Sequence, residues 1–350
     1  MRGGVIGKAV ALVGAVALLA AGSTVGFGQA PVRVTIGTVN NMNHVPQFVG
    51  VEKGIYIKHG VDVRLKVLNS GAEVMRALQA GDAQFATVAN TTLSSAWNAG
   101  VRLIAVCVVM GDATRVFDDD MFAITARPGS GIRRLHVEDL VGKRVGMVLG
   151  GTGEEYFRAV LARKGIPADR ITFVNVPAPN HVSVMQSGGV DAEVTWEPYG
   201  TMILQQVRGS YVVLRGGGYL GYNLYLMTPE DFIRRNAATV QAVVSGFAEA
   251  AWYVRHHQAE SALIATRWIE GLDPASATKA ITYMTFDPRF SKYTLQAHVL
   301  AERPMIERGR IRSPVDLSQA IRTTFVEQAM KEEPQVFADL KPIPPQAVLR

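Results

Sequence analysis

From residue 32 onward the chain alternates between short apolar, β-branched runs and longer stretches with helical spacing. The expected strands are 32–39, 61–68, 83–89 and 101–110, then 121–126, 143–149, 171–176 and 190–196. The expected helices between them are 44–54, 71–81, 91–100, 152–165, 180–189 and 197–207. Strands that alternate with helices of this length are typical of βαβ units, so the pattern predicts an α/β fold with mainly parallel strands.

The two halves of this pattern resemble each other. In each half a strand leads to a helix with a methionine (Met75 or Met185), a glycine turn, an aspartate (Asp82 or Asp191) and another strand. An internal echo of this kind predicts two similar α/β lobes. Two unrelated βαβ units are the alternative.

After residue 229 the strand pattern ends and helical periodicity takes over. Within 239–257, apolar residues recur at i, i+3, i+4, i+7, i+8 and i+11, which are Val240, Val243, Val244, Phe247, Ala248 and Ala251. This spacing predicts an amphipathic helix with one buried face. Prolines punctuate further helices beyond it, and we expect this helical tail to cover the first lobe.

The first thirty residues have the features of a secretory leader. Arg2 and Lys8 precede an apolar stretch from 9 to 22, and Gly28 and Ala30 supply small residues at a cleavage site before Pro31. A transmembrane span needs about 20 apolar residues, so we expect a cleaved signal peptide at 1–30 and an exported product. An uncleaved anchor helix is the alternative.

Charge and cysteine content exclude several classes of protein. The net charge is +6, of which Arg2 and Lys8 supply two, and the basic residues are scattered. The absence of a basic stripe with interleaved aromatics argues against a nucleic-acid partner. Cys107 is the only cysteine and lies in an apolar run, so it is expected in the core without a disulfide.

The segment 145–157, VGMVLGGTGEEYF, is a glycine-rich turn between a predicted strand and a predicted helix. It does not match a dinucleotide fingerprint, because Tyr156 stands where the third glycine is required. We expect Gly151, Thr152 and the helix N-terminus to form a small polar cradle. Glu154 and Glu155 beside it argue against a strongly anionic ligand; a plain turn is the alternative.

The sequence contains none of the common catalytic or metal-binding motifs. H-E-x-x-H, C-x-x-C and G-x-S-x-G are missing, and no Gly-Lys-Ser/Thr phosphate loop occurs. The acidic run at 118–120 is expected to be solvated surface rather than a cation site. We therefore predict no catalytic residue, no cofactor, no metal and no enzymatic activity.

Three segments together resemble a known family. They are 34–93, which includes EKGIYIKHGVDV and RALQAGDAQFATV, followed by 141–165 and 188–204. The order and content of these segments resemble the substrate-binding proteins of ABC importers for sulfonates, nitrate, taurine and the thiamine pyrimidine precursor. The resemblance covers roughly residues 32–260.

This resemblance implies a two-lobe type II periplasmic binding fold with a helical C-terminal extension packed on lobe 1. Lobe 1 would contain 31–124 and 222–350, and lobe 2 would contain 125–221. Two crossing strands with hinges near 118–125 and 221–228 would let the lobes close on a solute in the interlobe cleft. The partner would be an ABC permease in the inner membrane, and the protein is expected to be a monomer.

In open α/β sheets, ligands lie beyond the carboxyl ends of the strands. Applied to both lobes and to the second crossing, this rule predicts a ligand site made of Asn40, Asn41, His44, Ser70, Gly71, Asn90, Thr91, Thr92, Gly151, Thr152, Gly153, Glu154, Trp196, Glu197, Tyr222 and Asn223. Asn, Ser and Thr at these places also cap helices, which is the alternative role for several of them.

The predicted site is polar and mostly uncharged, with Trp196 as a stacking surface and no obvious cation, although Arg115 could reach the cleft. A sulfonate or nitrate fits N–H and hydroxyl donors, a pyrimidine-like solute fits Glu154 and Glu197, and an aromatic carboxylate fits Trp196. A ligand-sensing protein of the same fold stays open, as does an enzyme of the thiamine-pyrimidine-synthesis type, although that activity would need a cysteine cluster.

Overall fold

The described part of the chain, residues 1 and 30–349 of this computed structural model, contains ten strands in two sheets. The first sheet contains β1 (Val32–Val39), β2 (Val61–Leu68), β3 (Phe85–Ala89), β4 (Leu103–Met110) and β10 (Leu224–Pro229). The second contains β5 (Phe122–Ala126), β6 (Arg144–Met147), β7 (Thr172–Asn175), β8 (Ala192–Trp196) and β9 (Tyr211–Arg215). The predicted signal peptide lies outside the described residues.

The two sheets have the same topology. Their strand orders are β2-β1-β3-β10-β4 and β7-β6-β8-β5-β9. In each sheet one strand, β10 or β5, runs antiparallel to both of its neighbours, and the other described pairings are parallel. The prediction of two similar, mainly parallel α/β lobes is therefore confirmed, and each lobe receives its antiparallel strand from the chain as it crosses from the other lobe.

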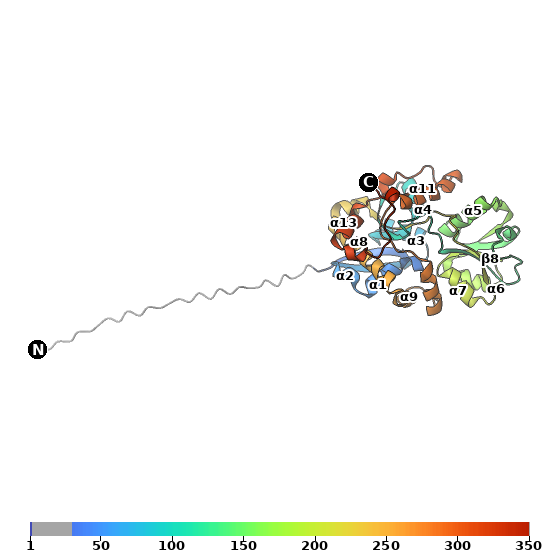
Figure 1. Ribbon diagram of the computed structural model, residues 1–350, viewed down its shortest axis with the longest axis horizontal. Helices are drawn as coiled ribbons and strands as arrows, with labels where there is room; N and C mark the ends of the chain where they lie inside the picture. Colours follow the sequence, from blue (N-terminus) through green and yellow to red (C-terminus); the bar gives the residue numbers. More distant parts are fainter. Residues whose placement is uncertain (2–29, 350) are drawn as a thin grey trace. The chain divides into compact units, whose positions relative to one another are not determined.

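Helices flank both sheets (Figure 1). The helices of the first lobe are α1 (Val45–Glu52), α2 (Ile55–Lys58), α3 (Gly71–Gln79) and α4 (Asn90–Asn98), and those of the second are α5 (Thr152–Lys164), α6 (His181–Ser187) and α7 (Tyr199–Gln206). The remaining helices are α8 (Glu230–His256), α9 (Gln258–Ala265), α10 (Pro274–Ala280), α11 (Lys292–Glu307), α12 (Leu317–Ala320) and α13 (Thr324–Glu332). All predicted helices are present. The strands predicted from the pattern do not include β9, and they do not include β10, which is expected only as the crossing strand near 221–228.

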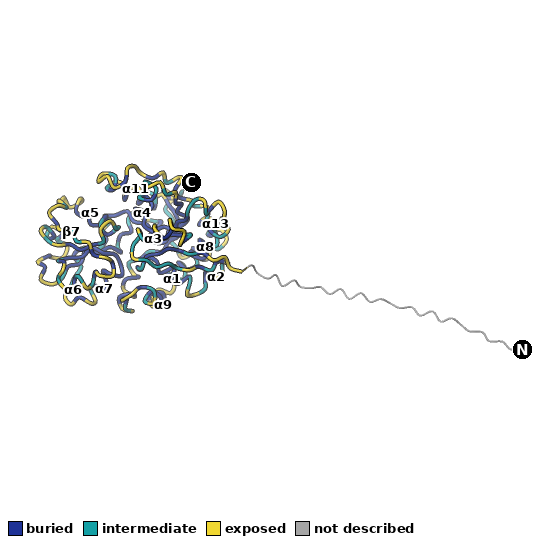
Figure 2. Tube along the Cα trace, turned by 180° about the vertical axis from the view of Figure 1, so that it is seen from behind, coloured by how far each residue is buried: buried dark blue, intermediate teal, exposed yellow. Residues whose placement is uncertain are grey.

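The core lies along the central strands, which are dark blue in Figure 2. All residues of β3, β4, β5 and β8 are buried, because helices or loops cover both faces of these strands. Cys107 is fully buried in β4, as predicted, and burial raises the pKa of its thiol.

The C-terminal extension (residues 230–349) packs mainly on the first lobe. The amphipathic helix predicted at 239–257 is the second part of α8, which begins at Glu230 and is kinked at Asn236. Its apolar face is buried, and α8 packs against α1, α2 and α13, while α11 packs against α4. The extension also reaches the second lobe through α10, which contacts α7.

The two connections between the lobes, residues 111–121 and 216–223, are joined by one carboxylate. Asp119 accepts hydrogen bonds from the backbone amides of Gly218, Tyr219 and Leu220 at 3.0, 2.7 and 3.1 Å. Asp118 and Asp119 are each only 2% exposed, so the prediction that 118–120 is solvated surface is wrong for these two residues. Three backbone donors satisfy the Asp119 carboxylate, and Arg115 pairs with Asp118.

In the described part of the chain, no helix combines the length and the apolar character that a membrane crossing requires.

Candidate solute-binding cavity

A cavity of about 410 Å³ lies between the two lobes. The first lobe lines it with the end of β1, the start of α3 and most of α4, and the second with the loop before α5 and the end of β8. Arg310, from the C-terminal extension, lies at the same cavity. This volume is in the usual range of small-molecule sites.

The structure brings most of the predicted site residues to this cavity. Those that line it are Asn41, His44, Ser70, Gly71, Thr91, Thr92, Gly151, Thr152, Trp196 and Tyr222. Those that do not line it are Asn40, Asn90, Gly153, Glu154, Glu197 and Asn223. The carboxyl-end rule therefore locates the cavity, but it does not tell which side chains face it.

The amides outside the cavity hold neighbouring segments together. The Nδ2 of Asn90 donates to the Gly221 carbonyl at 2.9 Å, and the Nδ2 of Asn223 donates to the Thr294 carbonyl at 3.0 Å. Asn40 accepts from the Tyr199 hydroxyl at 2.7 Å, which joins the two lobes beside the cavity.

The two predicted carboxylates outside the cavity are engaged by arginines. Glu154 pairs with Arg158 at 2.7 Å and also accepts from the Gly150 amide, while fully buried Glu197 pairs with Arg215 at 2.6 Å. Gly153 packs instead behind Trp196, where an added Cβ would lie 3.7 Å from the indole ring. Neither carboxylate is available as an acceptor for a ligand.

Three helices begin at the cavity, and each directs the positive end of its dipole toward it. Ser70 caps α3 by accepting from the Glu73 amide at 3.3 Å, while α4 and α5 begin at Asn90 and Thr152. Residues from the first turn of each helix line the cavity. A helix N-terminus carries a partial positive charge that stabilises a nearby anion, so these three helix ends favour a negatively charged group at the cavity.

Two arginines at the cavity add to this potential, so the prediction of a site without a cation is wrong. Arg76 lies on the second turn of α3, is exposed, and its guanidinium has no ion-pair partner among the described residues. Arg310 pairs with Glu155. Arg115 does not line the cavity, because it pairs with Asp118 and with Asp112 at 3.2 Å.

Glu155 also differs from its expected role. It is 2% exposed and receives both Arg308 and Arg310 from the extension, and Arg310 also donates to the Gly150 carbonyl. The two guanidinium groups more than neutralise this carboxylate. The argument from the sequence that Glu154 and Glu155 disfavour an anion therefore does not hold in the folded protein.

Apolar side chains complete the cavity wall, chiefly Met75, Val88, Phe122, Val148 and Leu224. Phe122 is supported from behind by Tyr156, whose ring stacks on it with centroids 5.3 Å apart. The Tyr156 hydroxyl donates to the Gly216 carbonyl at 2.8 Å. The tyrosine that breaks the dinucleotide fingerprint thus supports the cavity wall, and the arrangement suits a solute with an anionic group and an apolar body.

His44 is an uncharged member of the site. It is fully buried, and burial lowers the pKa of its imidazole from 6.5 to about 3, so it is neutral at neutral pH. Tyr222 is also buried, and burial raises the pKa of its phenol, so it keeps its proton. The polar groups at this wall therefore act as neutral hydrogen-bonding partners.

The family model NMT1/THI5 like matches residues 41–261, which include the residues that line the cavity except Val39 and Arg310. The chain belongs to the NMT1/THI5-like family.

Named relatives of this member of the NMT1/THI5-like family are binding proteins. A binding protein of Brucella abortus is 26% identical over 188 residues, which cover 54% of this chain and 54% of the relative. The taurine-binding periplasmic protein of Escherichia coli is 25% identical over 185 residues, which cover 52% of this chain and 53% of the relative. The chain thus matches about half the length of these relatives. The periplasmic aliphatic sulphonate binding protein of Escherichia coli has a similar fold, with a TM-score of 0.69 and 19% identity over 83% of this chain and 98% of the other.

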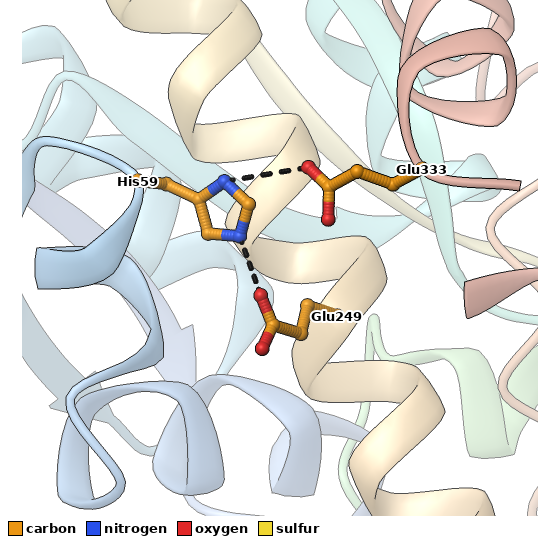
Figure 3. Close-up of side chains that lie close together, drawn as sticks. All are labelled: His59, Glu249 and Glu333. Atoms are coloured by element: carbon orange, nitrogen blue, oxygen red, sulfur yellow. Dashed lines mark hydrogen bonds and ion pairs between the residues drawn. The ribbon is translucent and has the colours of Figure 1, made fainter. Parts of the chain in front are cut away.

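One group of side chains outside the cavity has the composition of a metal site (Figure 3). His59, Glu249 and Glu333 offer ligand atoms that all lie within 4.8 Å of one another. In the structure the two ring nitrogens of His59 face Glu249 at 2.7 Å and Glu333 at 3.6 Å, and Lys58 pairs with Glu249 at 2.7 Å. These contacts already engage the imidazole, so we interpret the group as an ionic contact that fastens the end of α13 to α2 and α8.

Proposed function

We propose that this protein is a periplasmic solute-binding protein that captures a small organic anion between its lobes and delivers it to an ABC permease in the inner membrane. The sequence supports export, because residues 1–30 have the features of a cleaved signal peptide. The protein acts as a monomer with two lobes: lobe 1 contains 31–124 and 222–350, and lobe 2 contains 125–221. The two lobes close on the solute by hinge motion at the connections around 118–125 and 221–228.

The observation that carries the proposal is the electropositive interlobe cavity. Three helix N-termini and Arg76 face a space of about 410 Å³ whose walls are largely apolar. Oxyanions such as sulfonates and carboxylates match such donors, and an alkyl or aryl body matches the apolar walls. A neutral pyrimidine uses this potential less well, so we rank it below a sulfonate or carboxylate.

Thermal unfolding in the presence of candidate solutes tests the proposal. The panel contains alkyl and aryl sulfonates, aromatic carboxylates, nitrate and neutral pyrimidines, in a buffer free of sulfonates. A solute at 100 times its Kd stabilises the native state by about 2.7 kcal/mol, which raises the unfolding midpoint by several degrees.

We expect such a shift with at least one organic anion. A shift with a neutral pyrimidine and none with any anion would overturn the proposed solute class. Refolded, ligand-free protein that responds to no solute would count against solute capture itself.

A further inference from the structure

Asp118 is a buried carboxylate in the first connection between the lobes, residues 111–121. Its Oδ1 pairs with Arg115, whereas its Oδ2 is buried and has no hydrogen-bond partner among the described residues. The neighbouring Asp119 is equally buried, but three amides of the second connection satisfy its carboxylate. Asp118 is therefore only half satisfied, and it lies in a segment that must bend when the lobes move.

A single guanidinium serves three carboxylates in this connection. Arg115 pairs with Asp118, with Asp112 at 3.2 Å and with Asp120 at 3.7 Å. Three negative charges against one positive charge leave the group with an excess of negative charge. Asp118 is the least exposed of the three carboxylates, so it is the member that gains most from taking up a proton.

The environment of Asp118 changes its proton affinity accordingly. Burial is the largest cause, and it raises the pKa of the carboxyl from 3.8 to about 7. Arg115 acts in the opposite direction, while the like charges of Asp112 and Asp120 raise this pKa further. In this structure the Asp118 carboxyl therefore exchanges its proton near neutral pH.

Two side chains from other elements also lie near Asp118, and both stay uncharged at neutral pH. Tyr222, from the second connection, is buried, and burial raises the pKa of its phenol, so it keeps its proton. Thr285, from the C-terminal extension, brings a hydroxyl group. The Gly111 amide donates to the Thr285 carbonyl at 2.9 Å, so the extension holds the start of the first connection in place.

Resting on the hinge motion of the proposed function, we propose that Asp118 is a proton-sensitive switch in the hinge, and that a proton on its carboxyl favours the arrangement in which the two lobes touch. The lobes touch in this structure, where the Tyr199 hydroxyl donates to Asn40 at 2.7 Å, and Asp118 is buried in the same arrangement. Bending of the first connection lets water reach the carboxylate and stabilises its ionised form.

The direction of the pH effect follows from this difference in hydration. With the lobes touching, the pKa of Asp118 is about 7, and with the carboxyl in water it returns toward 3.8. Between these values the touching form binds a proton that the open form does not, so acid favours contact between the lobes. From pH 8 to pH 6 the ratio of touching to open molecules should rise roughly 10-fold.

Distances between two nitroxide labels, one on each lobe, test the switch without any solute. Ala80→Cys at the end of α3 and Ala162→Cys on α5 supply exposed sites for the labels. Cys107, the single native cysteine, is fully buried, so it stays unlabelled. Pulsed electron paramagnetic resonance measures the distance distribution, and we expect the population with the lobes touching to be larger at pH 6 than at pH 8.

Two variants assign the pH dependence to its source. Asp118→Asn keeps the size of the side chain but cannot ionise, so its distance distribution should be the same at both pH values and resemble that of wild type at pH 6. Asp120→Asn is the matched control, because Asp120 shares Arg115 but its side chain is half exposed. It should keep the pH dependence, displaced to slightly lower pH, since one like charge near Asp118 is gone.

A second measurement covers the case in which Asp118→Asn does not fold. In protein labelled with ¹³C at the aspartate carboxyls, one resonance should titrate near pH 7 in wild type and at slightly lower pH in Asp120→Asn. A wild-type protein with no aspartate carboxyl that titrates near neutral pH would overturn the switch.

The outcomes separate this inference from the proposed function. A distance distribution that is the same at pH 6 and pH 8, or a pH dependence that Asp118→Asn retains in full, overturns the switch while solute capture stands. Failure of every solute in the thermal unfolding panel overturns solute capture, and it does not alter the distances measured in the absence of solute.

Discussion

Glu155 of α5 and Arg310 of the C-terminal extension form an ion pair at the edge of the interlobe cavity. The two residues are 155 positions apart in the sequence, and Arg308 pairs with the same carboxylate. Glu155 is almost fully buried, whereas the side chains of Arg308 and Arg310 are 31% and 34% exposed. The extension therefore contacts the second lobe by charge at the edge of the cavity.

We expect E155Q to loosen this contact between the lobes. The variant leaves two guanidinium groups without a carboxylate, and with their partial exposure taken into account the unfolding free energy should fall by about 1–2 kcal/mol. Dissociation of a bound anion should also become several-fold faster, because the closed form loses a contact. Urea unfolding and stopped-flow dissociation measure the two effects.

Glu307→Gln is the control for E155Q, since Glu307 pairs with Arg303 on the exposed face of α11. It should change the unfolding free energy by less than about 0.5 kcal/mol. Equal effects of the two substitutions would show that the Glu155 contact has no special role.

Arg76 is expected to hold the anionic group of the solute. R76Q should weaken anion binding about 10-fold, or ~1.4 kcal/mol, because it removes a charge that faces the cavity without a competing carboxylate. The unfolding midpoint should stay within a few degrees, since this side chain is exposed. Calorimetric titration in low salt gives the affinity.

Arg64→Gln on β2 serves as the comparison for R76Q, because Arg64 is also exposed but does not line the cavity. It should leave the affinity unchanged. Full affinity in R76Q would mean that the helix N-termini hold the anion without this guanidinium.

Asp119 is predicted to determine how firmly the two connections are held together. Asp119→Ala leaves three backbone amides without their acceptor, so the unfolding free energy should fall by about 2–4 kcal/mol. Asp120→Asn is the control, because the Asp120 side chain is half exposed and pairs only loosely with Arg115 at 3.7 Å. Urea denaturation measures the unfolding free energy of both variants. If Asp119→Ala lowers this free energy no more than Asp120→Asn does, the prediction is wrong.

His44 should make the protein less stable in acid. Its folded pKa of about 3 lies below the ordinary value of 6.5, so between these values the unfolded chain binds a proton that the folded protein does not. Stability from this source is present above pH 6.5 and is lost as the pH falls toward 3, by up to about 1.4 kcal/mol per pH unit.

The difference between wild type and His44→Phe isolates this effect, because other groups titrate in both proteins. The unfolding free energy of the variant relative to wild type should rise steadily as the pH falls from 6.5 toward 3. A difference that does not vary with pH over this range would show that His44 is not buried in its neutral form.

The sequence by itself determined the order of the elements, the α/β class, the two similar lobes and the helical extension. These features follow from local periodicity, because a side chain is assigned to the inside or outside by its place in a strand or helix. The strand ends that border the cavity were also predictable, since parallel strands share one carboxyl edge. The short strand β9 was not distinguished from the loops around it.

Only the tertiary structure decided which side chains face the cavity and which charges meet there. Asn90 and Thr91 both follow β3, and Tyr222 and Asn223 both precede β10. The amides of Asn90 and Asn223 are nevertheless engaged by backbone carbonyls of other segments. Arg310 reaches Glu155 from a distant part of the chain. Such long-range pairings depend on how whole elements pack and on where each rotamer points, and local sequence patterns do not contain that information.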